Sequence, residues 1–254
     1  MQLKDKTAII TGGGTGIGRA IAHRFAAEGA KIAICGRRLE PLERVARELG
    51  NANESPYWQT ADVSRKADVD RFIGNVVDRF GRIDILVNNA GILFRKDILS
   101  TNEQDWDEMF AINVKGVYLC CKAALPHMID RKAGNILNIG SVSGIRATTY
   151  ADAYSASKAA VHILTRSLAK GYAKDGIRVN CICPAHIDTR IMDTTIDFFN
   201  SMGIESDRAK IDSLYPLGRR GMPEDVASLA VFLVSDQSSW MTGSLIVLDG
   251  GATA

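Results

Sequence analysis

The sequence has little of several features that mark particular classes of protein. Only six prolines occur, aromatic residues make up 7% of the chain, and 31 Lys and Arg nearly balance 29 Asp and Glu. This balance argues against a nucleic-acid or anionic-membrane partner, which would favour a concentrated basic patch. Because no run of about 18 apolar residues is present, a membrane-spanning helix is not expected. The remaining composition, with 46% hydrophobic residues in 254, is typical of one globular domain.

The five cysteines do not form a recognisable framework. Cys120 and Cys121 are adjacent, Cys181 and Cys183 are one residue apart, and Cys35 stands alone. Without a CxxC pair, the ligand spacing of zinc or thioredoxin-like sites is missing, so we expect no metal. The opening MQLKDKT and the four apolar residues after it are too short for a secretory leader. Together these features predict buried, reduced thiols in a cytoplasmic protein.

Short, almost continuously apolar runs alternate with helical patterns. Such runs are typical of strands buried on both faces. They are Thr7–Thr11, Lys31–Cys35, Asp84–Asn88, Asn135–Ile139, Ile177–Ile182 and Leu245–Leu248. Apolar residues spaced for helices occupy Gly16–Glu28, Asp107–Met128 and Ala153–Tyr172. This alternation predicts an α/β fold: a doubly wound, Rossmann-type parallel sheet with helices on both faces, in a single domain over residues 1–254.

The segment 191–217 breaks this alternation. It is polar but interleaved with large apolar residues such as Met192, Phe198 and Phe199. A long irregular stretch in a regular α/β chain is usually functional, so we expect a mobile substrate lid. Its acidic residues also predict a weak bias against strongly anionic substrates. Alternatively, its aromatic residues pack it onto the body or onto a neighbouring subunit.

A glycine-rich turn follows the first predicted strand and opens the first predicted helix. Residues Thr11–Gly18 read TGGGTGIG, with the spacing Gly12-x-x-x-Gly16-x-Gly18. Glycines let the backbone approach a pyrophosphate closely, and a helix N-terminus offers unpaired N–H groups to it. A strict G-x-G-x-x-G pattern is absent, and a Walker A loop is excluded because no Gly-Lys-Ser/Thr follows. The context predicts a dinucleotide site, with a purely structural turn as the alternative.

The end of the second predicted strand bears on cofactor choice. A protein that prefers NAD usually has Asp or Glu here to bind the ribose 2′-hydroxyl. This chain has Gly36 followed by Arg37 and Arg38. Guanidinium groups attract a 2′-phosphate through charge-assisted hydrogen bonds. We therefore predict NADP(H) as the preferred cofactor, with NAD(H) also possible; alternatively, both arginines simply begin a solvated helix.

Tyr154 and Lys158 are spaced to lie on one face of a helix. An ammonium beside a phenol favours the phenolate, so such a tyrosine can donate or accept the proton of a carbonyl reduction or alcohol oxidation. Tyr118 and Lys122 have the same spacing, but Tyr118 adjoins an apolar helix stripe and is predicted to pack internally. Tyr154 instead follows Ser141, at the carboxyl end of a predicted strand, where ligands of α/β sheets collect. Ser141 could hold the substrate oxygen there, or serve only as a turn residue.

These motifs, in this order, resemble the short-chain dehydrogenase/reductase family. The resemblance rests on TGGGTGIG, Asn88-Asn89-Ala90-Gly91, Ser141, Tyr154-x-x-x-Lys158, the segment Pro184–Thr189 and Asp249-Gly250-Gly251, and it covers essentially the whole chain. It implies four catalytic residues: Asn113, Ser141, Tyr154 and Lys158. The predicted cofactor-binding residues are Gly12, Gly14, Thr15, Gly16, Ile17, Gly18, Arg37, Arg38, Asp62, Val63, Asn88, Ala90, Gly91, Tyr154, Lys158, Pro184, Ile187 and Thr189.

The resemblance also implies individual roles. Asn113 would hold a water that links the lysine to solvent, although from spacing alone it is a helix-surface residue. Asp62 and Val63 would contact adenine, and Asn88, Ala90 and Gly91 would line the adenosine ribose and support the sheet. Lys158 would also bind the nicotinamide ribose, and Ile187 and Thr189 the carboxamide.

One position departs from the family pattern. Ala185 stands where Gly is common, and its Cβ could narrow the nicotinamide pocket or shift the loop. His186 follows it and could touch substrate, although a lone loop histidine is more often simply exposed.

The resulting prediction is an oxidoreductase that transfers a hydride between NADP(H) and a carbonyl or secondary alcohol. A 3-oxoacyl thioester, a sugar or polyol, and a simple ketone or alcohol remain open as substrates. The alternatives are a non-catalytic NAD(P)-binding sensor and an epimerase or dehydratase, which would usually need a longer C-terminal region. By resemblance, the protein is expected to form a homotetramer through its two long helices and C-terminal strand.

Overall fold

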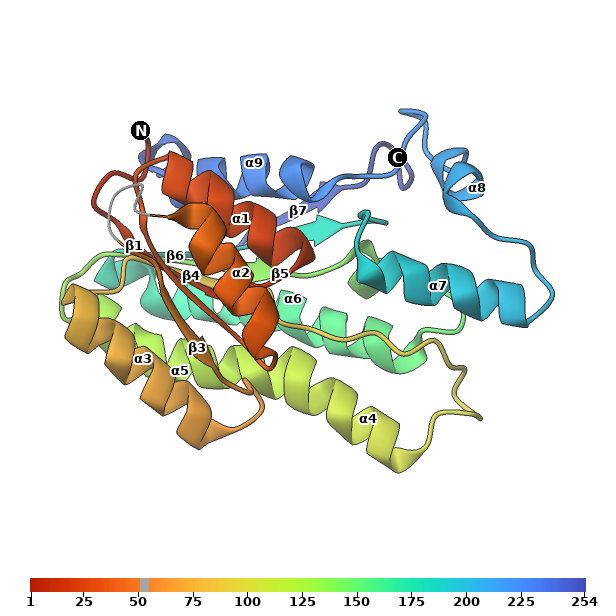
Figure 1. The fold of residues 1–254 in the computed structure, drawn as a ribbon, viewed down its shortest axis with the longest axis horizontal. Coiled ribbons are helices and arrows are strands. Elements are labelled where there is room, and N and C mark those ends of the chain that lie inside the picture. The colour runs from red at the N-terminus through yellow and green to blue at the C-terminus, as the bar shows by residue number, and fades with distance from the viewer. Residues whose placement is uncertain (51–54) are drawn as a thin grey trace.

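The fold is built around one parallel sheet. A computed structural model describes residues 1–50 and 55–254. Seven strands are arranged in the order β3-β2-β1-β4-β5-β6-β7 (Figure 1). They are β1 (Thr7–Thr11), β2 (Lys31–Gly36), β3 (Tyr57–Thr60), β4 (Ile85–Asn88), β5 (Gly134–Ile139), β6 (Ile177–Pro184) and β7 (Leu245–Leu248). Every neighbouring pair is parallel, which confirms the predicted doubly wound fold in a single domain.

Helices cover both faces of the sheet. They are α1 (Gly16–Ala27), α2 (Leu39–Leu49), α3 (Lys66–Phe80), α4 (Glu103–Phe110), α5 (Gly116–Ile129), α6 (Asp152–Tyr172), α7 (Arg190–Ser201), α8 (Arg208–Asp212) and α9 (Pro223–Val234). One core cluster joins α1, α2 and α9 to the sheet, and a second joins α3, α5 and α6 to its other face (Figure 1). The central strands therefore bury side chains on both faces, as their continuous apolar runs predict.

The strand at one edge is absent from the predicted set. β3 reads YWQT, and its side chains are only half-buried or exposed. An edge strand packs against fewer neighbours, so it does not need the continuous apolar run that identifies the central strands.

The long helix predicted to begin at Asp107 begins earlier. Asn102 caps α4, because its side chain accepts a hydrogen bond from the backbone N–H of Asp105 at 2.7 Å. Helical structure then continues through a π-helical segment, Ala111–Lys115, into α5. The first turns of α4 are polar, so apolar spacing does not indicate where the helix begins. The capping residue Asn102 would have indicated it.

The chain reverses its direction of winding between β1 and β4. In a doubly wound sheet, a crevice opens at the carboxyl ends of the strands at this point, and ligands bind there. The turns after β1 and β4 meet at this edge, because β1 and β4 are parallel neighbours in the sheet. The segments after β5 and β6 lie at the same edge because all strands run parallel.

The segment 191–217 contains helical structure rather than an irregular loop. It includes most of α7 and all of α8, and Met192, Ile211 and Tyr215 form a small apolar cluster apart from the two main ones. Phe198 and Phe199 contact the ring of Tyr150, at 5.5 and 6.5 Å between ring centroids. These aromatic side chains therefore pack α7 onto the body. Movement of the segment as a lid stays a prediction.

Candidate active site

The glycine turn leaves the first turn of α1 open to a ligand. Gly12 and Gly16 have φ angles of +66° and +52°, a region that favours glycine. A Cβ on Gly18 would lie 2.4 Å from the Gly12 carbonyl oxygen, so the turn can close this tightly only with glycine there. Thr15, which precedes α1, makes no side-chain capping bond to it. The N–H groups at the start of α1 thus remain available to a phosphate.

Asn89 holds this turn, although the sequence analysis did not select it. Its Nδ2 donates to the carbonyl oxygens of Thr11 and Gly12 at 2.9 and 3.3 Å. The Thr11 hydroxyl in turn accepts the backbone N–H groups of Asn89 and Ala90, both at 3.0 Å. These bonds tie the turn after β1 to the turn after β4. Asn89 directly follows a predicted strand, where an amide side chain can bond to a neighbouring turn, and this position could have identified it.

Asn88 ends β4 and is buried. Its amide donates to Asn138 on β5 at 2.8 Å and to the Cys121 thiol at 3.3 Å. These bonds tie β4 to β5 and α5, which agrees with the expected support of the sheet. The contact of Asn88 with the cofactor stays a prediction.

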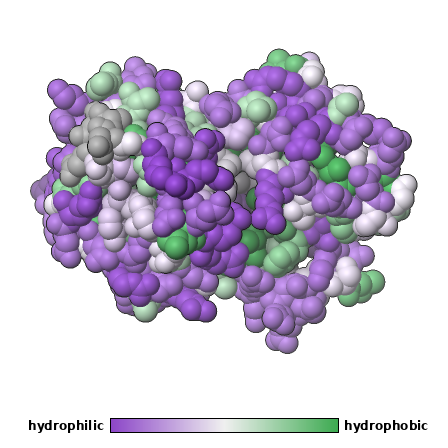
Figure 2. Space-filling view, viewed as in Figure 1, coloured by the Kyte–Doolittle hydropathy of each residue, from purple (hydrophilic) through white to green (hydrophobic). Residues whose placement is uncertain are grey.

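A cleft of about 330 Å³ lies at the winding reversal. Its lining includes many predicted cofactor residues, namely Gly12, Gly14, Thr15, Arg37, Arg38, Asp62, Val63, Ala90 and Gly91. Figure 2 shows a mostly hydrophilic face, with hydrophobic residues gathered in the hollow near its middle. Gly36 and the two arginines line one wall, and the loop after β3 supplies Asp62 and Val63. The lining suits the adenosine end of a dinucleotide, where a phosphate would meet cationic side chains.

Five predicted cofactor residues, Gly16, Ile17, Pro184, Ile187 and Thr189, are not among those that line this cleft. Gly16 faces Thr189: a Cβ on this glycine would lie 3.0 Å from the threonine methyl group. Ile17, in the first turn of α1, packs against the core cluster that joins α1, α2 and α9 to the sheet. Pro184 ends β6, and Ile187 is buried and forms an isolated bridge with Gly221. The loop from β6 to α7 thus returns to the start of α1.

Lys158 is buried beside Tyr154. Only 6% of Lys158 is exposed, and its ammonium donates to the Ile139 carbonyl oxygen at 2.8 Å. The same nitrogen lies 5.6 Å from the centre of the Tyr154 ring. No carboxylate pairs with Lys158 among residues 1–50 and 55–254. An ammonium held in this way supplies positive charge next to a phenol without neutralisation by an acid.

Asn113 lies inside, not on the helix surface as its spacing alone suggested. It is 1% exposed, within the π-helical segment. Its amide oxygen accepts the Ile92 N–H at 2.9 Å, and its Nδ2 donates to the Ile92 carbonyl at 3.0 Å and to the Ser157 hydroxyl at 3.1 Å. A Cβ on Gly91 would lie 3.2 Å from the Asn113 oxygen and 3.6 Å from the Lys158 nitrogen. Asn113, Gly91 and Lys158 therefore converge.

Ser141 lies two residues after the end of β5 and is buried. Its hydroxyl oxygen accepts the Ser143 N–H at 3.1 Å, so the hydroxyl proton remains free to be donated. The short 3₁₀ turn Val142–Gly144 packs against α6, the helix that carries Tyr154 and Lys158. The structure thus shows Ser141 in a turn, and its role in holding a substrate oxygen stays a prediction.

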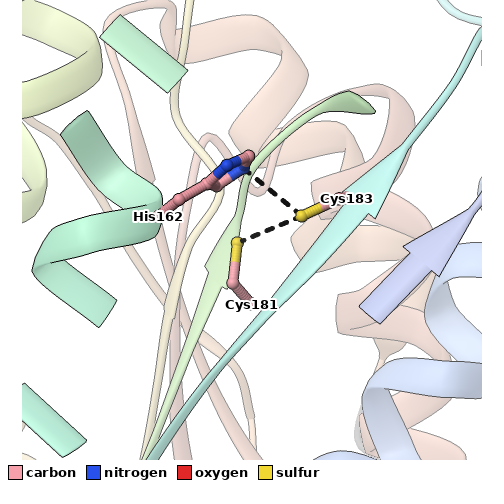
Figure 3. A group of neighbouring side chains, drawn as sticks. All are labelled: His162, Cys181 and Cys183. Atoms are coloured by element: carbon pink, nitrogen blue, oxygen red, sulfur yellow. Dashed lines mark hydrogen bonds between the residues drawn. The ribbon is translucent and has the colours of Figure 1, made fainter. Parts of the chain in front are cut away.

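A cluster of His162, Cys181 and Cys183 lies behind Ser141 (Figure 3). The Ser141 N–H donates to His162 Nε2 over a long 3.5 Å, and this nitrogen lies 3.3 Å from Cys183 Sγ. The two thiols are 3.9 Å apart. The hydrogen bond shared with Cys181, followed by that of His162, lowers the pKa of the Cys183 thiol. The cluster thus lies beneath the Ser141 backbone and gives its N–H a hydrogen-bond acceptor.

The sequence analysis missed this cluster. Alternation along β6 puts Cys181 and Cys183 on one side of the strand, and His162 lies one helical turn after Lys158 on α6. Their three potential metal-ligand atoms lie within 4.8 Å of one another. The expectation of no metal stays a prediction. The predicted burial of all five cysteines, each with a free thiol, is confirmed.

Ala185 and His186 occupy defined positions after β6. Ala185 does not adopt the positive φ that would require glycine, and its side chain packs against the cluster of Met192, Ile211 and Tyr215. His186 is half-buried rather than exposed, and its Nδ1 lies 2.6 Å from the Tyr215 hydroxyl oxygen. Burial lowers the pKa of His186. Ala185 therefore fills a packing position without a positive φ angle.

The second Tyr-Lys pair lies at the surface. Tyr118 is 46% exposed, so the prediction that it packs internally is wrong. The Lys122 ammonium donates to its hydroxyl oxygen at 3.1 Å.

Comparisons with known proteins identify the family of this chain. The family model described as enoyl-(acyl carrier protein) reductase matches residues 12–253. The chain belongs to the short-chain dehydrogenase/reductase family. Oxidoreductase UcpA of Salmonella typhimurium is 42% identical, covering 99% of this chain and 96% of its own. Meso-2,3-butanediol dehydrogenase of Serratia marcescens is 37% identical, covering 100% and 97%. The 3-oxoacyl-[acyl-carrier-protein] reductase FabG of Thermotoga maritima is also 37% identical, covering 99% of each.

The crystal structure of gox2181 has a similar fold, with a TM-score of 0.92 and 32% identity over 99% of this chain and 97% of that one. As a short-chain dehydrogenase/reductase, the protein is an NAD(P)-dependent oxidoreductase that acts on a small molecule at a CH–OH or carbonyl group. Within the described residues, no helix has both the length and the apolar character needed to cross a membrane.

Proposed function

We propose that the protein transfers a hydride between NADP(H) and the carbonyl or secondary-alcohol carbon of a small substrate. The observation that carries this proposal is the buried, acid-free ammonium of Lys158 beside the Tyr154 ring, with Asn113 and Gly91 converging on it. The relatives act, by name, on a vicinal diol and on a 3-oxoacyl thioester. A 3-oxoacyl thioester, a sugar or polyol, and a simple ketone or alcohol are therefore the substrate classes to test.

The residues present fit a dinucleotide, because the first turn of α1 is uncapped and the glycine turn leaves no side chain in front of it. When bound, the nicotinamide supplies the hydride in reduction or takes it up in oxidation. In the reductive direction, the Ser141 hydroxyl holds the substrate oxygen and Tyr154 donates a proton to it. Lys158 stabilises the resulting phenolate by its charge. Asn113 maintains the path by which the proton is replaced from solvent.

A preference for NADP(H) is supported by the end of β2. Gly36 places no carboxylate there, and Arg37 and Arg38 line the same cleft. Arg37 lies 3.8 Å from Glu108, but both side chains are about half exposed, so this ion pair is weak and can yield to a phosphate.

The test measures kcat/KM for NADPH and NADH with a ketone panel, in the wild type and Arg37→Ala. The variant should lose its advantage with NADPH by about tenfold or more, because a charge-assisted bond is lost, while NADH changes little. An unchanged ratio would remove Arg37 from this role. NADPH should be consumed in stoichiometric amounts, whereas an epimerase returns its hydride and a sensor consumes none.

We further propose a cytoplasmic homotetramer and a mobile 191–217 segment. Exposed apolar side chains on the outer sides of α5 and α6, including Tyr118 and Ile163, support association through these helices. Light scattering of the purified protein distinguishes a tetramer from a monomer.

A further inference from the structure

Arg95 is a buried cation near the start of α6, the helix that carries Tyr154 and Lys158. It is 9% exposed, in the loop between β4 and α4. Its Nε donates to the Thr195 hydroxyl at 3.3 Å, and its Nη1 donates to the Thr149 carbonyl oxygen at 3.2 Å. Its guanidinium lies 5.3 Å from the centre of the Phe199 ring. In the described part of the chain, no carboxylate lies within ion-pair distance of it. A guanidinium has five N–H donors, so these two long bonds leave donors available.

The contacts of Arg95 place it between α7 and the start of α6. Lys96 forms a parallel bridge with Ala151, three residues before Tyr154, and Thr149 lies on the same approach to α6. Thr195 and Phe199 belong to α7. Arg95 also interacts electrostatically with the Tyr154 phenol and with His186. The Arg95 guanidinium thus lies between α7 and the segment that leads into α6, the helix that carries Tyr154.

His186 adds a second donor to this side. The Tyr215 hydroxyl oxygen accepts the His186 backbone N–H at 3.0 Å, so its own proton can be donated to His186 Nδ1, 2.6 Å away. An imidazole that accepts at Nδ1 and stays neutral carries its proton on Nε2. His186 then carries an N–H on Nε2, so together with Arg95 it adds a second hydrogen-bond donor to this region.

The acidic residues of segment 191–217 do not offset this positive charge. Asp193 pairs with Arg208 at 2.6 Å, and Asp212 pairs with Arg220 at 2.8 Å. Asp188, just before the segment, pairs with both arginines. Because these three carboxylates are bonded to arginines, they leave little net negative charge at their positions, and the predicted weak bias against strongly anionic substrates stays a prediction.

We propose that Arg95, assisted by His186, is an anion-binding subsite that receives the carboxylate of a short oxo or hydroxy acid. The proposal rests on the hydride-transfer function above. A planar carboxylate matches the fork of a guanidinium and would supply the counter-charge that the protein does not. Leaving a cation buried without a partner is costly, and a substrate that neutralises it gains specificity over its uncharged analogue.

The test compares acids with their methyl esters, for example 3-oxobutanoate with methyl 3-oxobutanoate, and the corresponding 2-oxo pair. Wild type should favour one acid in kcat/KM. Arg95→Met should lower kcat/KM for that acid by about 10–100-fold, largely through KM, and that for the ester less than threefold. Arg95→Lys, which keeps the charge but not the fork, should fall between them. Arg190→Met, an exposed cation at the start of the same α7, is the matched control and should leave both substrates unchanged.

Binding without turnover separates this proposal from the function on which it rests. Calorimetry of the protein with NADP⁺ should detect butanoate but not methyl butanoate, and Arg95→Met should abolish the signal. Arg95-dependent butanoate binding without turnover of any carbonyl compound would contradict the hydride-transfer function and leave the subsite standing. Equal binding of butanoate by wild type and variant would overturn the subsite. So would an equal loss of acid and ester turnover with a lowered melting temperature, because Arg95 would then be a structural brace for α7.

Discussion

Two tyrosine–lysine pairs with the same spacing occupy different environments in this molecule. In both Tyr118–Lys122 and Tyr154–Lys158, the lysine nitrogen lies 5.6 Å from the centre of the tyrosine ring. At the surface, Lys122 donates directly to the phenol oxygen of Tyr118. In the site, Lys158 is buried and donates to the Ile139 carbonyl instead. The spacing fixes the local geometry, and the surroundings decide its chemical use.

The difference shows how a buried charge is kept available. Water screens an ammonium at the surface, so it has little effect on its neighbour. Lys158 is buried, fixed by one neutral carbonyl, and unpaired with any acid among the described residues, so water and counter-charges screen it less than they screen Lys122. We therefore expect equivalent substitutions in the two pairs to have very different consequences.

Replacing the tyrosine of each pair should give the largest contrast. Tyr154→Phe removes the proposed proton donor and should lower kcat by about 10²–10⁴-fold, while cofactor binding is retained. Tyr118→Phe should leave kcat within twofold of wild type. Steady-state kinetics and cofactor fluorescence titration measure both. Appreciable turnover by Tyr154→Phe would remove this residue from catalysis.

Replacing the lysine of each pair should give a smaller contrast. Lys158→Met should lower kcat by about 10–100-fold and weaken cofactor binding, because both a buried charge and a predicted ribose contact are lost. Lys122→Met, the matched surface change, should alter neither quantity. Steady-state kinetics and cofactor titration measure both, and an unchanged kcat for Lys158→Met would remove this charge from catalysis.

Asp84 can be compared with Lys158, because it is also a buried charge but lies far from the catalytic edge of the sheet. Its side chain is 6% exposed and accepts bonds from Arg82, Arg131 and the Thr7 N–H. Burial alone would raise the pKa of this carboxyl, but the Arg82 and Thr7 bonds outweigh burial and hold the pKa below its usual value. Asp84→Asn should cost about 1.5–3 kcal/mol of stability at neutral pH and leave kcat within twofold.

The pH dependence of this loss follows from the direction of the shift. A carboxyl with a lowered pKa stabilises the fold above its unfolded value of about 3.9, and this contribution fades as the pH falls through the lower folded value. The difference in melting temperature between wild type and Asp84→Asn should therefore be largest near pH 7 and shrink below about pH 4. A difference that stays constant down to pH 2 would show that ionisation of Asp84 is not its source.

The sequence predicts the elements whose signals are local. The buried central strands and the glycine turn follow from apolar runs and glycine spacing, so both could be located before the structure. β3 could not, because an edge strand such as YWQT carries no such run. The position of Arg95 depends on contacts with residues 54 and 100 positions away, Thr149 and Thr195, which no local pattern reveals. The His162 cluster likewise requires knowing which face of α6 meets β6.

The π-helical segment Ala111–Lys115 sets the rotational phase between the two halves of one continuous helix. Each residue of an α-helix turns the next side chain by about 100°, so one wide turn changes which side chains face inward beyond it. The Asn113 side chain lies on the inner side, near Lys158. Tyr118, the third residue of α5, lies on the outer side and is exposed. Deleting a single residue here would turn the downstream helix out of alignment with its upstream half. This stretch should therefore tolerate substitutions far better than changes in length.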